Sequence, residues 1–370
     1  MEIYLLVITF YTFIYGILRL LMNSTRGINK KCLSILFILC FGGISTLRSQ
    51  FVGTDTILYT NLYQSMGTNS HLSTLKSSKY PMYELYNVFL YKFSDSPQMI
   101  TFFNAFIIII LMSFIIYFWA DRQFMSSILY VTLYFYFYSM NIGRQFVAMS
   151  ILMMGVIKLF KGKKIEFWLL YLTALLVHST AIIGAIFYIL FKIRWTGKKN
   201  IVLAIITVVI LLLYTKIVDI FIILFPMYSG YVEGTGGVTL DVESKGNQLF
   251  LTFFYLLFVI LGNYFLAKYH SSNNNPKLGF LNASMIISTL MGLFFYKNIL
   301  ISRISIYFTI YVIFYIPSVL NLVSKTYIKD KFKQDIILNY LTVCTIGITF
   351  IPMIFQLTKN ISGVVPYSFM

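Results

Sequence analysis

Charged residues are scarce in this sequence. They make up 11% of the 370 residues, while hydrophobic residues make up 59% and the mean hydropathy is +0.81. Soluble globular domains carry about 25% charged residues, and no polar stretch here is long enough to form such a domain. The composition therefore excludes an ordinary soluble protein and predicts an all-α, polytopic membrane protein with a single integral membrane domain over residues 1–370.

Cysteine is rare, and acidic residues are few beside basic ones. Cys32, Cys40 and Cys344 lie in apolar runs without metal-ligand spacing, so the sequence predicts no disulfide, no bound metal and no cofactor. The 29 Lys and Arg residues against 12 Asp and Glu give a net charge of +17. These basic residues stand in short clusters between apolar runs, which is typical of a membrane topology signal and does not indicate nucleic-acid binding.

Apolar runs of spanning length, roughly 17 to 25 residues, recur along the whole chain. The N-terminus lacks the basic region and cleavage site of a signal peptide, so its apolar run is expected to be a retained span. About twelve transmembrane or re-entrant helical segments are predicted, at about 2–22, 32–49, 98–120, 124–140, 144–160, 165–177, 179–191, 200–222, 248–267, 278–296, 303–322 and 335–355.

The basic clusters predict which connections face the cytoplasm. If they are cytoplasmic, both termini face outward and most acidic residues lie outside. Two long connections then face outward, at about 50–97 and 226–247. The second part of the first has the spacing of a helix lying along the bilayer surface. The second is rich in Gly and either covers a site or merely connects two spans.

Residues 165–191 lie between two strongly basic clusters. If both clusters are cytoplasmic, this segment must leave and return with about 13 residues per leg, roughly 20 Å, which is too short to cross a 30 Å hydrocarbon core. A re-entrant pair of short helices would place His178 at its tip. One long tilted helix with basic loops on opposite sides is the alternative. Both arrangements put His178 at membrane depth.

Six ionisable residues stand apart from the basic clusters and map to the outer side in this topology: Arg48, Asp55, Glu84, Arg144, His178 and Arg303. Ionisable groups at membrane depth are costly unless paired or hydrated, so together they predict a cationic cavity that opens outward. Each has a plainer interpretation by itself. The arginines could snorkel to the headgroups, His178 could be a core residue, and Asp55 could cap a helix.

Three arginines without a metal-ligand cluster favour a phosphate-type polyanion, because a guanidinium binds phosphate oxygens through two hydrogen bonds and keeps its charge. A lipid pyrophosphate that diffuses laterally in the bilayer fits the depth of these residues. The many tyrosines and phenylalanines also suit sugars and isoprenoid chains, with little specificity.

Several stretches together resemble the EpsG family of bacterial exopolysaccharide proteins, which look like Wzy-type polymerases. They are LRSQFVGTDTILY, NIGRQFVAMSILMMGVIKLFKGKK, ALLVHSTAIIGAIFYI, SRISIYF and VVPYSF, in this order over nearly the whole chain. The resemblance implies a GT-C-like glycosyltransferase at the outer face of the bacterial cytoplasmic membrane. Such an enzyme joins undecaprenyl-pyrophosphate-linked oligosaccharide repeat units into an exopolysaccharide or capsular polysaccharide, with a chain-length regulator and a flippase as candidate partners.

The leaving group suggests roles for the family-like positions. Departure of the pyrophosphate from the sugar gathers negative charge, which fixed cations can stabilise as a metal would. Arg144 and Arg303 are therefore expected to bind the pyrophosphate without a metal. His178 is the preferred base for the acceptor hydroxyl, and Asp55 is the alternative base or orients a sugar. The other expected substrate-binding residues are Gly53, Tyr59, Glu84, Gln145 and Arg48, the last of which either completes the anion site or pairs with Asp55.

Two other functions use similar residues. A flippase for the same lipid-linked sugars is the first, but the sequence has no internal repeat and its isolated charges favour one side of the membrane. A membrane acyltransferase with His178 as base is the second. Its acyl donor is usually cytoplasmic, which is opposite to the predicted side of His178.

Overall fold

The computed structural model describes residues 1–21, 29–66, 80–216, 219, 223, 242–269, 275–294 and 299–370. Within these ranges every regular element is a helix, and the strand-like contact is an isolated antiparallel bridge between Arg48 and Phe369. The prediction of an all-α protein is therefore confirmed for the described part of the chain. Two compact units form, Met1–Tyr188 with Thr345–Met370, and Ile189–Cys344.

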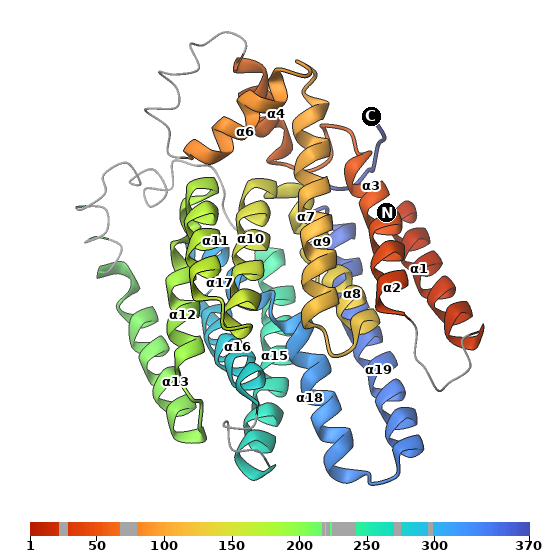
Figure 1. Ribbon diagram of the computed structural model, residues 1–370, viewed down its shortest axis with the longest axis vertical. Helices are drawn as coiled ribbons and strands as arrows, with labels where there is room; N and C mark the ends of the chain where they lie inside the picture. Colours follow the sequence, from red (N-terminus) through yellow and green to blue (C-terminus); the bar gives the residue numbers. More distant parts are fainter. Residues whose placement is uncertain are drawn as a thin grey trace. The chain divides into compact units, whose positions relative to one another are not determined.

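The first unit holds the N-terminal helices and the end of the last helix (Figure 1). Its elements are α1 (Glu2–Leu21), α2 (Lys30–Phe37), a π-helical turn (Ile38–Gly42), α3 (Gly43–Thr46), α4 (Thr56–Ser65), α6 (Pro81–Tyr91), α7 (Gln98–Trp119), α8 (Gln123–Thr132), α9 (Phe135–Asn141), α10 (Gly143–Phe160), α11 (Lys164–Val177), a 3-10 turn (Ser179–Ile183) and most of α12 (Gly184–Lys192).

The second unit holds the remaining helices and the start of the last one. They are α13 (Gly197–Leu212), α15 (Val242–Tyr269), α16 (Pro276–Phe294), α17 (Ile299–Thr309), α18 (Val312–Tyr327) and α19 (Lys331–Thr358). A buried polar network joins four of these helices. Asn263 accepts hydrogen bonds from Asn200 at 2.6 Å and Asn282 at 2.9 Å, and Asn282 also accepts one from the hydroxyl of Tyr315.

Five of the described helices are long and apolar enough to cross a membrane: α1, α7, α10, α15 and α19. The pair Ile301–Thr309 and Val312–Tyr327, bent by 40°, makes a sixth if it is one span. These helices support an integral membrane protein. Twelve full spans are not found among the described residues, so the predicted count of about twelve transmembrane or re-entrant segments is not confirmed.

Two of the predicted segments depart from a regular α-helix at identifiable residues. The segment 124–140 breaks between α8 and α9, where Tyr134 adopts a left-handed backbone with φ of 72°. The segment 32–49 stays helical as far as Thr46, but it contains the π-helical turn between α2 and α3. Apolar composition alone carries no signal for these departures, because the same residues are compatible with a regular α-helix.

The two predicted outer connections are described to different extents. In 50–97 the structure has α4 and α6, with residues 67–79 outside the described part, and the helix expected in the second half is present as α6. Most of 226–247 lies outside the described residues, and from Val242 onward the chain belongs to α15.

Residues 165–191 form a helical hairpin, as expected for a pair of short helices. The rings of Phe167 in α11 and Tyr188 in α12 stack at 5.9 Å, and the Tyr171 hydroxyl donates to the Ile182 carbonyl at 3.4 Å. Phe167, near the start of α11, thus meets the middle of α12, whereas Tyr171, further along α11, meets the turn before α12. This order of contacts requires antiparallel legs, so the chain reverses near His178. One continuous tilted helix is not what the structure contains.

Candidate active site

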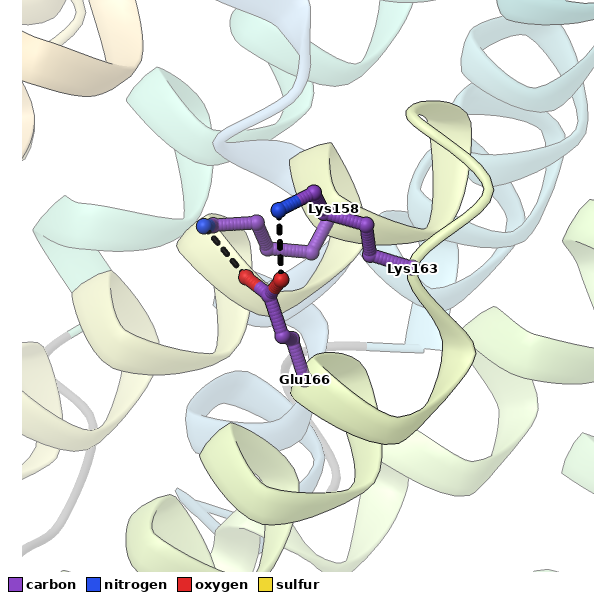
Figure 2. A network of polar contacts seen from close by, with 3 residues as sticks. All are labelled: Lys158, Lys163 and Glu166. Atoms are coloured by element: carbon purple, nitrogen blue, oxygen red, sulfur yellow. Dashed lines mark hydrogen bonds and ion pairs between the residues drawn. The ribbon is translucent and has the colours of Figure 1, made fainter.

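Arg144 and His178 are brought to one end of the first unit by the hairpin of α10 and α11. At the closed end of this hairpin Glu166 accepts hydrogen bonds from Lys158 and, at 2.7 Å, from Lys163 (Figure 2). Midway, Gly155 lets the helices approach closely, since an added Cβ would lie 3.3 Å from Cδ2 of Phe167. This antiparallel register places the start of α10 beside the end of α11.

The guanidinium of Arg144 lies against three tyrosine rings. Its Cζ atom is 3.9 Å from the ring centre of Tyr80, 5.5 Å from that of Tyr83 and 5.7 Å from that of Tyr59. We call these three rings with Arg144 the tyrosine cage. Figure 1 shows α4 and α6, which carry Tyr59 and Tyr83, beyond the ends of α10 and α11. Cation–π contacts of this kind hold a guanidinium without neutralising its charge.

Tyr83 is fixed in the cage by α7. Its hydroxyl accepts a hydrogen bond of 2.8 Å from Nδ2 of Asn104. Burial raises the pKa of Tyr83 to about 12, against smaller lowering effects of the Asn104 hydrogen bond and the Arg144 charge. The ring therefore stays a neutral phenol at physiological pH and offers Arg144 a π face, not a counter-charge.

His178 adjoins the cage through Tyr80, whose ring stacks on the imidazole at 5.4 Å and 22°. The imidazole is only 6% exposed. Its Nδ1 atom accepts a hydrogen bond of 3.3 Å from the backbone N–H of Thr180 and lies 2.7 Å from the Thr180 hydroxyl oxygen. A backbone N–H can only donate, so the neutral ring carries its proton on Nε2.

This tautomer changes what His178 is able to do. A neutral imidazole protonated on Nε2 donates a hydrogen bond there, and the nitrogen able to accept a proton is the one that already binds Thr180. The geometry therefore favours His178 as a donor over the expected general base. The same observation favours Asp55, the alternative residue, as the general base.

The GTDT loop is built against the junction of α9 and α10. Gly53 has φ of 103°, and a Cβ there would lie 2.7 Å from the Met140 carbonyl oxygen. The side-chain oxygen of Asn141 accepts hydrogen bonds of 2.8 Å from the hydroxyl of Thr54 and from the backbone N–H of Asp55. Glycine is thus required for the close approach. This geometry favours a positioning role for Gly53 over the expected contact with substrate.

Asp55 stands at the N-cap of α4, and its side chain makes no capping hydrogen bond. The plain capping interpretation therefore lacks support. Tyr59, which belongs to the cage, follows one helical turn later, so the two side chains share a face of α4. Asp55 consequently lies on the side of α4 that faces Arg144.

Arg48 is tied to the backbone. It is 2% exposed and donates hydrogen bonds to the carbonyls of Ser45 at 2.6 Å and Met140 at 3.1 Å. The guanidinium is thus directed at backbone carbonyls, and the described part of the chain shows no pairing of Arg48 with Asp55. This geometry favours a structural role for Arg48 over the expected anion contact.

The remaining expected residues are placed as follows. Gln145 is 1% exposed in the first turn of α10, next to Arg144. Glu84 follows Tyr83 in α6, and its Oε2 atom is buried. Arg303 lies in α17 of the second unit, and its contact with pyrophosphate stays a prediction. Within the described residues no group of three or more His, Cys, Asp or Glu side chains is spaced to hold a metal.

Sequence reasoning missed Tyr80, Tyr83 and Thr180. The stretch YPMYELYN contained the signal, because aromatic residues three apart lie on one helix face. Without knowing that Arg144 lies beside this stretch, the sequence indicated only an interfacial helix. Thr180 follows His178 in HST, and its contact depends on the 3-10 turn after α11.

The chain was compared with known protein families, curated proteins and solved structures. A family model described as "EpsG family" matches residues 30–369 of the chain, from α2 to the penultimate residue. No curated protein and no solved structure matches the chain.

Proposed function

We propose, since this chain belongs to the EpsG family, that it is a membrane protein of polysaccharide biosynthesis that acts as a repeat-unit polymerase. Its donor is a growing glycan on undecaprenyl pyrophosphate, and its acceptor is a sugar hydroxyl of a second lipid-linked repeat unit. The reaction takes place at the outer face of the bacterial cytoplasmic membrane, and we assign the protein to the GT-C-like glycosyltransferases.

The tyrosine cage is the observation that carries this proposal. Arg144 is half-buried and held by tyrosine rings, and its Nε atom has no hydrogen-bond partner among the described residues. No carboxylate among the described residues is shown to pair with Arg144, and a partly buried cation without such a partner is costly, which suits a residue whose counter-ion is the substrate. Aromatic faces around a cation also suit a ligand that joins a sugar to a phosphate, because sugars stack on rings.

The chemistry follows from these positions. The acceptor hydroxyl attacks C1 of the donor sugar, a new C–O bond forms, and the bond from C1 to the pyrophosphate breaks. The proton of the acceptor passes to Asp55, and the charge that gathers on the departing pyrophosphate is stabilised by Arg144. The Nε2 proton of His178 supplies a further hydrogen bond to an oxygen of the substrate.

The proposal is tested with purified protein in lipid nanodiscs and a synthetic undecaprenyl-pyrophosphate-linked repeat unit. Polymer separated on a gel should form a ladder that persists in EDTA, because arginine supplies the counter-charge. Movement of the lipid-linked substrate across liposome membranes without any ladder would instead indicate a flippase. A ladder that requires a divalent ion would contradict the role given to Arg144.

A further inference from the structure

Buried polar atoms without a partner are concentrated on two neighbouring helices, α6 and α7. Within the described part of the chain, no hydrogen-bond partner exists for Oε2 of Glu84, the hydroxyl of Tyr86, Oδ1 of Asn87, Oγ1 of Thr101 and Oδ1 of Asn104. Asn87, Thr101 and Asn104 are only 2%, 2% and 3% exposed. Such atoms carry their full desolvation penalty, so their concentration in one place points to groups that are satisfied by a ligand.

Helix spacing places Asn87, Thr101 and Asn104 along the contact between α6 and α7. Asn104 of α7 donates to the Tyr83 hydroxyl of α6 at 2.8 Å, which joins the two helices. Asn87 lies one helical turn after Tyr83, and Thr101 lies one turn before Asn104, so both are closer to the short connection between the helices. We call Glu84, Asn87, Thr101 and Asn104 the α6–α7 polar seam.

The seam adjoins the tyrosine cage. Tyr83 belongs to both, since its ring centre is 5.5 Å from Cζ of Arg144 and its hydroxyl binds Asn104. A Cβ on Gly143, the residue before Arg144, would lie 4.0 Å from Nδ2 of Asn104. If one group of a ligand binds Arg144, the neighbouring part of that ligand therefore lies beside the seam.

The chemistry of the seam differs from that of the cage. Its unpartnered atoms are two amide oxygens, a carboxylate oxygen and a hydroxyl, so hydrogen-bond acceptors prevail. An occupant must supply donors and carry no negative charge next to Glu84. Arg144, in contrast, is a positively charged hydrogen-bond donor and suits an anionic group. A sugar attached to a pyrophosphate matches this division, because its hydroxyl groups are donors and its phosphate is the anion.

We propose that the α6–α7 polar seam binds the hydroxyl groups of the donor sugar attached to the pyrophosphate and thereby selects that sugar. This inference rests on the proposed polymerase function. It assigns recognition to Asn87, Thr101 and Asn104.

The test compares Thr101→Val, which is close to isosteric but lacks the hydroxyl, with Thr101→Ser, which keeps it. In the nanodisc assay, Thr101→Val should raise the KM for the lipid-linked repeat unit about tenfold, the equivalent of one lost hydrogen bond, whereas Thr101→Ser stays near the wild type. Thermal unfolding should show Thr101→Val at least as stable as the wild type, because a buried hydroxyl without a partner has been removed. Asn87→Leu should behave like Thr101→Val.

Ser126→Ala is the matched control. Ser126 is 0% exposed with a hydroxyl that has no partner in the described part of the chain, and it lies in α8, beyond the far end of α7 from Thr101. It should gain stability without any change in KM. Wild-type polymer formation with an unchanged KM in Thr101→Val and Asn87→Leu overturns the seam and leaves the polymerase standing. Absence of polymer from the wild-type protein overturns both.

Discussion

Arg144 differs from a surface arginine in what surrounds its guanidinium. The centres of three tyrosine rings lie within 5.7 Å of its Cζ atom, and that of Tyr80 is the nearest at 3.9 Å. The planar guanidinium both stacks on a ring and presents parallel N–H groups to a phosphate, whereas an ammonium does neither. Substitution by lysine therefore separates the planar shape of the guanidinium from its positive charge.

Arg144→Lys should lower the polymerisation rate about 10²-fold and Arg144→Ala more strongly, by analogy with the loss of one preorganised donor to a developing negative charge. Rates are read from ladder formation in the nanodisc assay. Arg194→Lys, at an exposed arginine, is the control and should keep wild-type activity. Equal activity of Lys and Arg at position 144 would indicate a side chain that merely reaches the headgroups.

His178 offers a second test at the residue scale. If Nε2 donates a hydrogen bond, His178→Gln keeps an N–H near that position and should retain more activity than His178→Asn or His178→Ala. Asp55→Asn removes the proposed base and should lower the rate by roughly 10² to 10⁴. Full inactivity of His178→Gln together with an active Asp55→Asn would return the role of base to His178.

At the scale of elements, the α10–α11 hairpin sets the distance between Arg144 and His178. The hairpin depends on close approach at Gly155, where an added Cβ meets Phe167 and Leu170 at 3.3 Å and 3.4 Å. The Glu166 cluster at its closed end is partly exposed, and exposed ion pairs contribute only about 0–1 kcal/mol. Packing at Gly155 is therefore the more important determinant of the register.

Gly155→Val should destabilise the protein by about 1–3 kcal/mol through overpacking and should also reduce polymer formation, because α11 and His178 shift relative to Arg144. Thermal unfolding in detergent and the nanodisc assay measure the two effects. Gly347→Val in α19 is the matched control, since no atom lies within 4 Å of its added Cβ. Identical behaviour of the two variants would show that the hairpin contact does not position the site.

At the scale of the whole molecule, the basic clusters predict which side of the membrane the tyrosine cage faces. Basic clusters predict a cytoplasmic position for the turn between α10 and α11 and for the connection before α19, and an outer position for α4 and the connection after α6. The cage lies near α4 and α6, so its exposure to the outer face follows from the same scheme.

Labelling of single cysteines with a membrane-impermeant thiol reagent tests this scheme in a variant that lacks Cys32, Cys40 and Cys344. Gln64→Cys and Asp95→Cys, both at exposed positions, should be modified in intact cells. Lys163→Cys and Lys329→Cys, also exposed, should react only after the membrane is opened. Labelling of Lys163→Cys from outside would invert the topology and place the cage on the cytoplasmic side.

The sequence by itself determined the membrane class, the all-helical fold and the residues worth attention. Apolar runs can satisfy their backbone groups in a bilayer only as helices in a chain of this pattern. Isolated ionisable residues at membrane depth are costly enough to mark Arg144, His178 and Asp55 without any contact being known. These conclusions need only composition and position along the chain.

Tertiary structure decided which marked residues meet and what each can do. Arg48 and Arg144 look alike in sequence, but one binds backbone carbonyls and the other lies in a tyrosine cage. The tautomer of His178 follows from a single backbone N–H in the turn after α11. The break at Tyr134 and the π-helical turn between α2 and α3 are also not visible in the apolar pattern. Each of these depends on contacts between segments far apart in the chain or on local backbone geometry, which hydropathy does not encode.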